Sequence, residues 1–471
     1  MIVRPYEYWE SNKTLDYISY PSKEHKRKLV HYYKNNYPRI ENAPYLERDE
    51  INKYKLIRIQ HLVNYAYNNT DFYNYKYRKE GITPQDIKSL DDFSNIPVIT
   101  KDELIEAFPN SCVDLINYDE KKLFATRSSG SSGKVVKLLY DLNAVLEDTL
   151  HGVRQWKMQS EDKYSKNDKV AMIYTCPWWF GDIGEYFRNY FISSLLSVEE
   201  IVSVLYDIQP EIISCYPSVL NSIAPYITNL SNTYLIVIHS EQSTSEQRKY
   251  WSNLLGVPVL DEYSSEEATR IALQLPCGKY HVCEDTVHLE TIPSKNMKLD
   301  ATSKGVAVVT NLLNTAMPII RYIQGDLISL SESECSCGVK WSILESLDGR
   351  LNDSFITKNR KLINSGVLLD TTYRWLMETN LNIKNFVLSQ VDFDCLELSL
   401  LANDYSLIER NREKLNSLQS WLEIVFSHSI NLRCIPNYTE IRASSFKEKP
   451  IRCLLNIHES EEELTNLEVS L

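Results

Sequence analysis

The chain has 471 residues and a formal net charge of −12, with 43% hydrophobic and 24% charged residues. This length exceeds one ordinary core and favours two or three domains, and the composition is that of a folded globular protein without extended disorder. The acidic balance excludes the basic field of a general nucleic-acid or anionic-membrane surface, so any polyanion is expected to bind in a local pocket.

The segment Met1–Glu7 lacks the apolar core of a signal peptide, and no run of the sequence approaches the length of a membrane-spanning helix. A cytoplasmic protein without a membrane partner is therefore predicted. The 10 cysteines are scattered apart from one group: Cys277, Cys283, Cys335 and Cys337. This distribution indicates reduced thiols and one metal site, and not a disulfide framework.

Residues 1–95 are rich in Tyr, Lys and Asn and predict a helical N-terminal cap. Five apolar residues carry the helical spacing: Leu56, Ile59, Leu62, Val63 and Ala66.

A loop rich in hydroxyl groups and glycine follows at 126–134, and it has no large apolar side chain. Its candidate phosphate contacts are Ser128, Ser129, Gly130, Ser131, Ser132, Gly133 and Lys134. Glycine lets backbone N–H groups approach oxyanions closely, and hydroxyls add rotatable donors. The loop is not a Walker A motif, because only two residues separate Gly130 from Gly133. A flexible Ser/Gly surface turn is the alternative interpretation.

Short strands are predicted on both sides of this loop, at 124–126 and 135–140, and Asp141 is predicted to cap the helix that follows. Both ends of the loop are then held, which preorganises donors around a developing charge.

From Lys169 onward, short apolar runs alternate with polar stretches of helix length; the runs are 170–174, 212–216, 235–238 and 306–310. This alternation is typical of buried parallel strands joined by helices, so an α/β fold is predicted. Near 347–353 the pattern changes to a shorter-period α+β sequence. We therefore predict domains at 1–348 and 354–471.

Cys277, His281, Cys335 and Cys337 offer three thiols and one imidazole, enough to close a tetrahedral zinc site, with Cys283 in reserve. All four positions would be filled by protein, so a structural role is predicted. The alternative is four unligated buried thiols.

Four motifs occur in order: the loop at 126–134, Asp261–Glu267, Thr310–Asp326 and Gly349-Arg350. Together they resemble the adenylate-forming ligase superfamily, and within it the phenylacetate–CoA ligase branch with its capsule-biosynthesis relatives. The resemblance covers nearly the whole chain. It implies a large N-terminal adenylation domain with mixed sheets and helices, a hinge at 349–353 and a small mobile C-terminal α+β domain.

The resemblance also implies residue roles. The Ser/Gly loop would lie over the ATP phosphates, Glu267 near Mg²⁺, and Asp326 on the ribose hydroxyls, where a carboxylate can accept from a diol. Arg350 would neutralise charge at the hinge. Further nucleotide contacts would be Glu262, Tyr263 and Ser264. The ordinary alternatives are that Asp326 is a turn residue and that Glu266-Glu267 begins a solvated helix.

The C-terminal lysine of the superfamily is assigned to Lys449, with Lys447 as the alternative, and the pivot of the hinge to Asn352 or Asp353. The sequence departs from the family pattern at several places: no glycine precedes the C-terminal lysine, and the stretch 357–362 lacks the glycine that helps shape the thioester-forming loop. Val135 stands where proline is common, Ser264 replaces a glycine, and no glycine separates Ser240 from Glu241.

The implied reaction is ATP-dependent activation of an aromatic or hydrophobic carboxylic acid as an acyl adenylate, with release of pyrophosphate. The acyl group then passes to CoA, to a carrier-protein pantetheine thiol or to an amine. The predicted acid pocket is lined by Tyr174, Trp178, Trp179, Phe180, Tyr216 and Ser240, although aromatic residues are more often plain core. The competing hypothesis is a non-catalytic nucleotide-binding or scaffold protein, and the protein is expected to be a monomer or homodimer.

Overall fold

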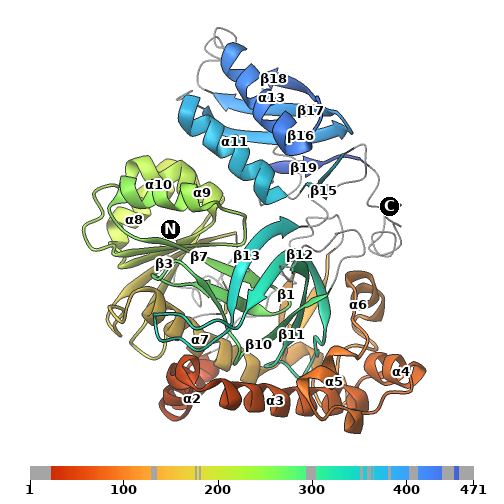
Figure 1. Cartoon of the computed structure of the whole chain (residues 1–471). Helices are drawn as coiled ribbons and strands as arrows, with labels where there is room; N and C mark the ends of the chain where they lie inside the picture. The colour runs from red at the N-terminus through yellow and green to blue at the C-terminus, as the bar shows by residue number, and fades with distance from the viewer. Residues whose placement is uncertain are drawn as a thin grey trace.

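In a computed structural model, the described residues are 23–128, 135–175, 178–179, 182–292, 304–350, 354–357, 362–363, 365–379, 383–402, 412–436 and 450–455. A large N-terminal part contains a long mixed sheet, and a smaller part with its own sheet lies above it in Figure 1. No helix among these residues is long and apolar enough to cross a membrane.

The N-terminal segment is helical over its described residues. Its helices are α2 (Lys23–Asn42), α3 (Arg48–Asn69), α4 (Asp71–Lys79), α5 (Leu90–Ser94) and α6 (Lys101–Ala107), with short 3₁₀ turns η1 (Ala43–Tyr45), η2 (Pro84–Asp86) and η3 (Glu120–Lys122). The predicted apolar spacing is confirmed on α3, where Ile59, Leu62, Val63 and Ala66 are buried. In Figure 1, α2 and α3 run along the side of the molecule opposite the C-terminal sheet.

The strands predicted beside the Ser/Gly loop form the antiparallel pair β1 (Phe124–Arg127) and β2 (Lys137–Tyr140). Helix α7 (Leu142–Gln159) follows directly, and its N-cap is Asp141, whose side chain accepts a hydrogen bond from the Ala144 amide. The predicted cap is therefore confirmed, and it fixes where β2 ends and α7 begins.

The large sheet contains eleven strands within the described residues, in the order β10-β11-β12-β13-β9-β8-β7-β6-β5-β3-β4. Their bounds are β3 (Lys169–Tyr174), β4 (Arg188–Ser193), β5 (Ile212–Cys215), β6 (Leu235–His239), β7 (Val259–Ser265), β8 (Thr269–Gln274), β9 (Tyr280–Val282), β10 (Val287–Ile292), β11 (Lys304–Asn311), β12 (Tyr322–Ser331) and β13 (Ile343–Arg350). Strands β3 to β7 are parallel. The helices of this region are α8 (Val198–Ile208), α9 (Pro217–Ile223) and α10 (Ser245–Leu255), with the turn η4 (Ala224–Tyr226).

The prediction of a parallel strand at 306–310 is wrong. Strand β11 is antiparallel to both of its neighbours, β10 and β12. Most of its residues are buried, which explains the continuous apolar run. Such a run indicates a strand covered on both faces and carries no information on the direction of its neighbours.

The C-terminal part has its own hydrophobic core, built around Phe355, Trp375, Leu398 and Leu422. Its sheet has the order β18-β17-β16-β19. The elements are β14 (Phe355–Ile356), β15 (Leu362–Ile363), α11 (Ser365–Thr379), β16 (Ile383–Asp392), β17 (Cys395–Ala402), α13 (Arg412–Phe426), β18 (Asn431–Pro436) and β19 (Ile451–Cys453). The predicted α/β class is confirmed; the separate small C-terminal domain and the boundaries at 349 and 353 stay predictions.

Candidate active site

Three segments that are far apart in the sequence meet at Glu266 and Glu267. Thr126 of β1 donates from its hydroxyl to Glu266 Oε2 at 2.7 Å, and the Tyr140 hydroxyl donates to the Glu266 carbonyl. Asn311 donates to the Glu267 carbonyl at 3.0 Å. The strands beside the Ser/Gly loop are thus joined to the acidic motif and to the end of β11.

Asp326 lies within β12 and is 9% exposed, so it is not a turn residue. Tyr263 of β7 donates from its hydroxyl to Asp326 Oδ2 at 2.7 Å. Four strand spacings separate β7 from β12 in the sheet order, which would be roughly 19 Å in a flat sheet. The sheet therefore curls, and its curvature brings these two motifs into contact.

A second tyrosine–carboxylate pair runs in the opposite direction between the same segments. Tyr322 of β12 donates to Glu267 Oε1 at 3.2 Å, and Glu267 is 5% exposed. Glu267 is therefore not at the start of a solvated helix. The two pairs hold both predicted nucleotide-site carboxylates at one place.

The base of the Ser/Gly loop is closed by two hydrogen bonds. The Ser128 amide donates to the Val136 carbonyl at 2.9 Å, and the Val136 amide donates to Ser128 Oγ at 3.0 Å. Val136 is buried, so the closure lies in the core. The remaining loop residues, Ser129, Gly130, Ser131, Ser132, Gly133 and Lys134, lie outside the described residues.

Arg350 is the last residue of β13, and its backbone lies in register with Asp326 of β12. The hinge motif and the ribose motif therefore share one position in the sheet. Five further predicted residues lie outside the described ones: Phe180, Asn352, Asp353, Lys447 and Lys449.

Glu262 is half-buried and belongs to a polar network with α7, and its predicted nucleotide contact stays a prediction. Gln155 of α7 donates to Glu262 Oε2 at 2.6 Å, and Arg270 donates to Gln155 and to Asp148. Burial raises the pKa of Glu262, and the positive charge of Arg270 opposes that rise. Ser264 follows on the same strand, opposite Arg270 in the register.

An aromatic cluster lies at the carboxyl ends of three adjacent parallel strands. Tyr174 ends β3, Tyr216 follows β5 and His239 ends β6. The imidazole of His239 stacks on Tyr174 with a centroid distance of 4.4 Å and an interplanar angle of 19°, and Tyr216 packs edge-on at 5.3 Å. Ligands of open α/β sheets bind at this edge.

His239 was missed in the sequence, although it directly follows the apolar run 235–238 and so sits at a strand end. The next residue, Ser240, has φ of 67° and places its hydroxyl 2.9 Å from His239 Nδ1. This left-handed backbone is one that glycine adopts more readily than serine.

The predicted acid pocket divides into two groups. Tyr174 and Tyr216 come together, with ring centroids 5.7 Å apart. Trp179 is instead a core residue: it is 1% exposed, packs on Tyr140 and donates from its indole to Asp148 Oδ2 at 2.8 Å. Trp178 packs against Trp179.

The four predicted metal ligands are gathered at one point. The ligand atoms of Cys277, His281, Cys335 and Cys337 lie within 4.8 Å of one another. His281 Nε2 is 3.6 Å from Cys277 Sγ and 3.4 Å from Cys337 Sγ. Tetrahedral zinc with ordinary Zn–S and Zn–N bonds would separate sulfur from nitrogen by about 3.6 Å. The donor set therefore fits zinc.

Two glycine turns and the protonation state of His281 favour metal binding by this cluster. Gly278 and Gly338 each follow a cysteine of the cluster and have φ of 83° and 86°, so each turns the chain tightly behind a thiol. Burial lowers the pKa of His281 to about 4, so its imidazole is neutral, as a ligand must be. Cys283, the reserve ligand, packs instead in a hydrophobic cluster with Leu273.

The two parts of the chain touch where β13 ends. Ser365, the first residue of α11, donates from its hydroxyl to Gln242 Oε1 at 3.3 Å. Gly349 has φ of 86°, and a Cβ built on it would lie 2.1 Å from Ser365 Oγ and 3.0 Å from Gln242 Oε1. A side chain at 349 is therefore incompatible with this contact.

Comparison with known proteins gives consistent results. No protein-family profile matches the chain. The phenylacetate–coenzyme A ligase of Thermus thermophilus is 25% identical over 347 residues, covering 68% of this chain and 74% of that protein. The phenylacetate–coenzyme A ligase of Escherichia coli is 23% identical over 328 residues, covering 66% and 73%.

Among solved structures, 2-hydroxyisobutyryl-CoA ligase in the postadenylation state with 2-HIB-AMP has a TM-score of 0.71 at 18% identity, covering 87% of this chain and 90% of that chain. The same enzyme with 2-HIB-AMP and CoA in the thioesterification state has a TM-score of 0.58 at 17% identity, covering 88% and 91%. The arrangement described here is more similar to the first of these.

Proposed function

We propose that the chain, which is similar in sequence to phenylacetate–coenzyme A ligases, activates a carboxylic acid with ATP as an acyl adenylate and then transfers the acyl group to the thiol of CoA. The observation that carries this proposal is the convergence of Tyr263, Asp326, Tyr322 and Glu267 beside the clamped base of the Ser/Gly loop. A ribose-binding carboxylate, a carboxylate for a cation and a phosphate loop are the parts that nucleotide activation requires.

In the proposed first step, a carboxylate oxygen of the acid attacks the α-phosphorus of ATP, a new P–O bond forms, and pyrophosphate leaves with the electrons of the broken bond. Asp326 holds the ribose by accepting hydrogen bonds from its hydroxyls. The Ser/Gly loop and Lys449 stabilise the negative charge that builds on the phosphoryl oxygens.

Glu267 is the residue that fits a magnesium ion. Its Oε1 accepts from Tyr322, and no hydrogen bond to Oε2 is found within the described part of the chain. A carboxylate oxygen that shares Mg²⁺ with substrate phosphates is the usual protein contribution to such a site. When bound, Mg²⁺ neutralises phosphate charge and orients the leaving pyrophosphate.

The acid is proposed to lie against the cluster of Tyr174, Tyr216 and His239. These rings line the carboxyl ends of β3, β5 and β6 and offer flat apolar walls, which suit an aromatic or hydrophobic acid.

A panel of carboxylic acids, assayed for pyrophosphate release with and without CoA, tests this function. We expect pyrophosphate to be released only when a suitable acid is present. We expect an acyl-CoA product when CoA is added. Release followed by acylation of a carrier-protein pantetheine or of an amine, with no acyl-CoA, would move the proposal to those acceptors. If no acid supports pyrophosphate release or exchange, the competing hypothesis of a non-catalytic nucleotide-binding protein holds.

We further propose that Cys277, His281, Cys335 and Cys337 hold a structural zinc ion. The site joins the β8–β9 turn to the turn at 335–338 and has no position for a substrate. Purified protein should carry about one equivalent of zinc, and Cys335→Ser should lose the metal and lower the thermal midpoint by several degrees.

The matched control is Cys434→Ser, because Cys434 is a half-buried thiol outside the cluster. This variant should keep the zinc ion at the cluster. Metal analysis that finds no zinc in protein never exposed to a chelator would refute the site.

Gly349→Ala is expected to disfavour the observed contact between the two parts. The new Cβ meets Ser365 and also occupies a left-handed backbone position, which costs about 1–2 kcal/mol for a residue with a side chain. Because the arrangement is more similar to a postadenylation state, adenylate formation should fall about tenfold and transfer from preformed adenylate should change less.

Gly256→Ala is the matched control, because Gly256 has φ of 69° and nothing within 4 Å of an added Cβ. It carries the backbone cost without the clash. Adding Ser365→Ala to Gly349→Ala removes the atom at 2.1 Å and should partly restore adenylate formation. Equal behaviour of Gly349→Ala and Gly256→Ala would show that the contact does not matter for the reaction.

A further inference from the structure

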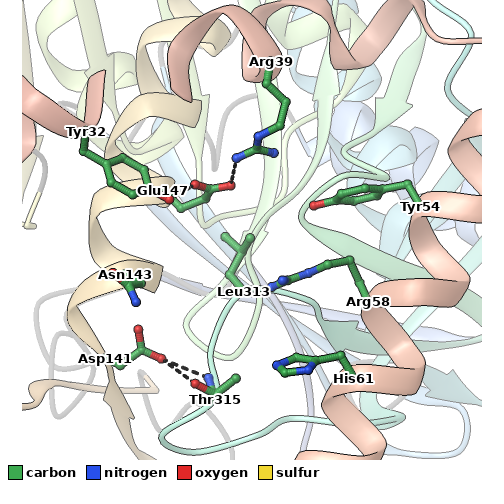
Figure 2. A pocket seen from close by; sticks show the side chains of 10 residues that line it. All are labelled: Tyr32, Arg39, Tyr54, Arg58, His61, Asp141, Asn143, Glu147, Leu313 and Thr315. Carbon is green, nitrogen blue, oxygen red and sulfur yellow. Dashed lines mark hydrogen bonds and ion pairs between the residues drawn. The ribbon is translucent and has the colours of Figure 1, made fainter. Parts of the chain in front are cut away.

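A cavity of about 470 Å³ lies between α2, α3 and the start of α7 and is closed on one side by the segment 312–315 (Figure 2). Its size is that of a small-molecule site. None of its lining residues belongs to the Tyr263–Asp326 site or to the aromatic cluster. In Figure 1, α2 and α3 lie on the side opposite the C-terminal part, so the cavity is separate from the candidate active site.

The two carboxylates in the wall of this cavity are already paired. Asp141 accepts from the Ala144 amide at 3.0 Å and from the amide and hydroxyl of Thr315 at 3.0 and 3.1 Å. Glu147 accepts from Tyr32 and from Arg39, and these two residues also line the cavity. Glu147 is therefore paired with a cation, and both oxygens of Asp141 are occupied by neutral donors of the protein.

Arg58 of α3 is only partly satisfied. Its Nη2 donates to the Leu312 carbonyl at 2.6 Å, whereas its Nε is buried and has no hydrogen-bond partner within the described part of the chain. Figure 2 shows the guanidinium reaching toward Leu313 in the middle of the cavity, with His61 and Tyr54 on either side of it along α3. Because Arg58 lines the cavity, it is the terminal nitrogens of its guanidinium, and not the buried Nε, that a ligand can reach.

The chemistry of Arg58 defines the kind of ligand that its terminal nitrogens would bind. A guanidinium stays charged at any physiological pH and presents paired N–H groups that match the oxygens of a carboxylate or a phosphate. Beside it, Tyr54 and Leu313 provide apolar surface for a ring or a short chain. The lining thus combines one available cation with an apolar wall.

We propose that this cavity is a second ligand site for a small organic anion, whose phosphate or carboxylate binds Arg58 and whose apolar body packs against Tyr54 and Leu313. The site does not depend on the adenylation chemistry. An occupant would lie against the segment that holds Asn314, which donates to the Leu139 carbonyl of β2 at 2.8 Å, and so would brace the loop between β11 and β12.

The test is calorimetric titration of the full-length protein, without ATP, with phenyl phosphate and separately with benzoate. Saturable binding of one equivalent of at least one probe is expected, and the preferred probe identifies phosphate or carboxylate as the recognised group. Arg58→Met, which keeps the length of the side chain, should weaken binding at least tenfold. Lys53→Met, an exposed cation on the same helix, should bind as the parent does.

Asn143→Trp provides an independent variant, since Asn143 is exposed at the start of α7 and lines the cavity, where an indole would fill the space. It should abolish binding even if Arg58→Met folds poorly. Absence of saturable binding for both probes would overturn the proposal. Binding that persists in Arg58→Met and in Asn143→Trp would also overturn it, because the anion would then sit elsewhere in the protein.

Discussion

Replacing Asp326 by alanine is expected to lower acid-dependent exchange of pyrophosphate into ATP by about 10- to 150-fold. The change removes a charged acceptor and leaves a ribose hydroxyl without its partner, which costs roughly 1.5–3 kcal/mol. It also leaves the buried Tyr263 hydroxyl without the bond that it makes at 2.7 Å. The effect should be seen mainly as a higher KM for ATP together with slower exchange.

Two controls separate binding of the nucleotide from loss of the tyrosine bond. Tyr263→Phe removes the same hydrogen bond but keeps the carboxylate, so its loss should be much smaller. Asp168→Ala removes a carboxylate that accepts from the Tyr234 hydroxyl at 2.9 Å. This similar pair lies at the amino ends of β3 and β6, away from the carboxyl ends where the aromatic cluster lies. The Asp168→Ala variant should leave exchange unchanged. Parental KM and turnover in Asp326→Ala would remove Asp326 from the proposed site.

Replacing Lys449 by alanine is expected to lower adenylate formation by about 100- to 1,000-fold, the range seen when one preorganised donor is removed from a developing oxyanion. Transfer of the acyl group from preformed adenylate should hardly change, because negative charge builds on the phosphoryl oxygens in the first half-reaction and not in the transfer. The Lys449→Ala variant should therefore impair the first half-reaction and leave the second nearly intact.

Lys447→Ala is the matched comparison, since this lysine lies two residues earlier in the same segment. Both variants are assayed for pyrophosphate exchange, and then for acyl transfer with synthetic acyl adenylate. A defect confined to Lys447→Ala would move the catalytic assignment to that residue. If both variants form adenylate at the parental rate, neither lysine stabilises the transition state; a parent that is itself inactive would favour the non-catalytic hypothesis.

Features that depend on short stretches of sequence were predictable. Asp141 was expected to cap α7 because an aspartate before an apolar helical pattern can accept from the first free amides, and its side chain does so. The strands on both sides of the Ser/Gly loop followed from their β-rich composition. The cysteine–histidine cluster was predictable as a ligand set, since few other arrangements place three thiols and one imidazole at such spacing.

Features that depend on how distant strands meet were not predictable. The direction of β11 depends on its neighbours β10 and β12, and an apolar run alone does not specify them. The stacking of His239 on Tyr174 requires two parallel strands to end at one edge, and the fate of Trp179 in the core depends on its bond to Asp148. Local pattern does not contain these contacts.

The sequence by itself determined the chemistry available to this protein: a hydroxyl- and glycine-rich loop, carboxylates at Glu267 and Asp326, and a thiol and imidazole set. Only the tertiary structure decided where these groups lie. Tyr263 reaches Asp326, and Tyr322 reaches Glu267, because the long sheet curls and brings β7 to β12. The cavity beside Arg58 likewise exists only where residues of α2, α3, α7 and the segment 312–315 come together. Side-chain identity is local, whereas the distance between side chains is set by the twist and packing of whole elements.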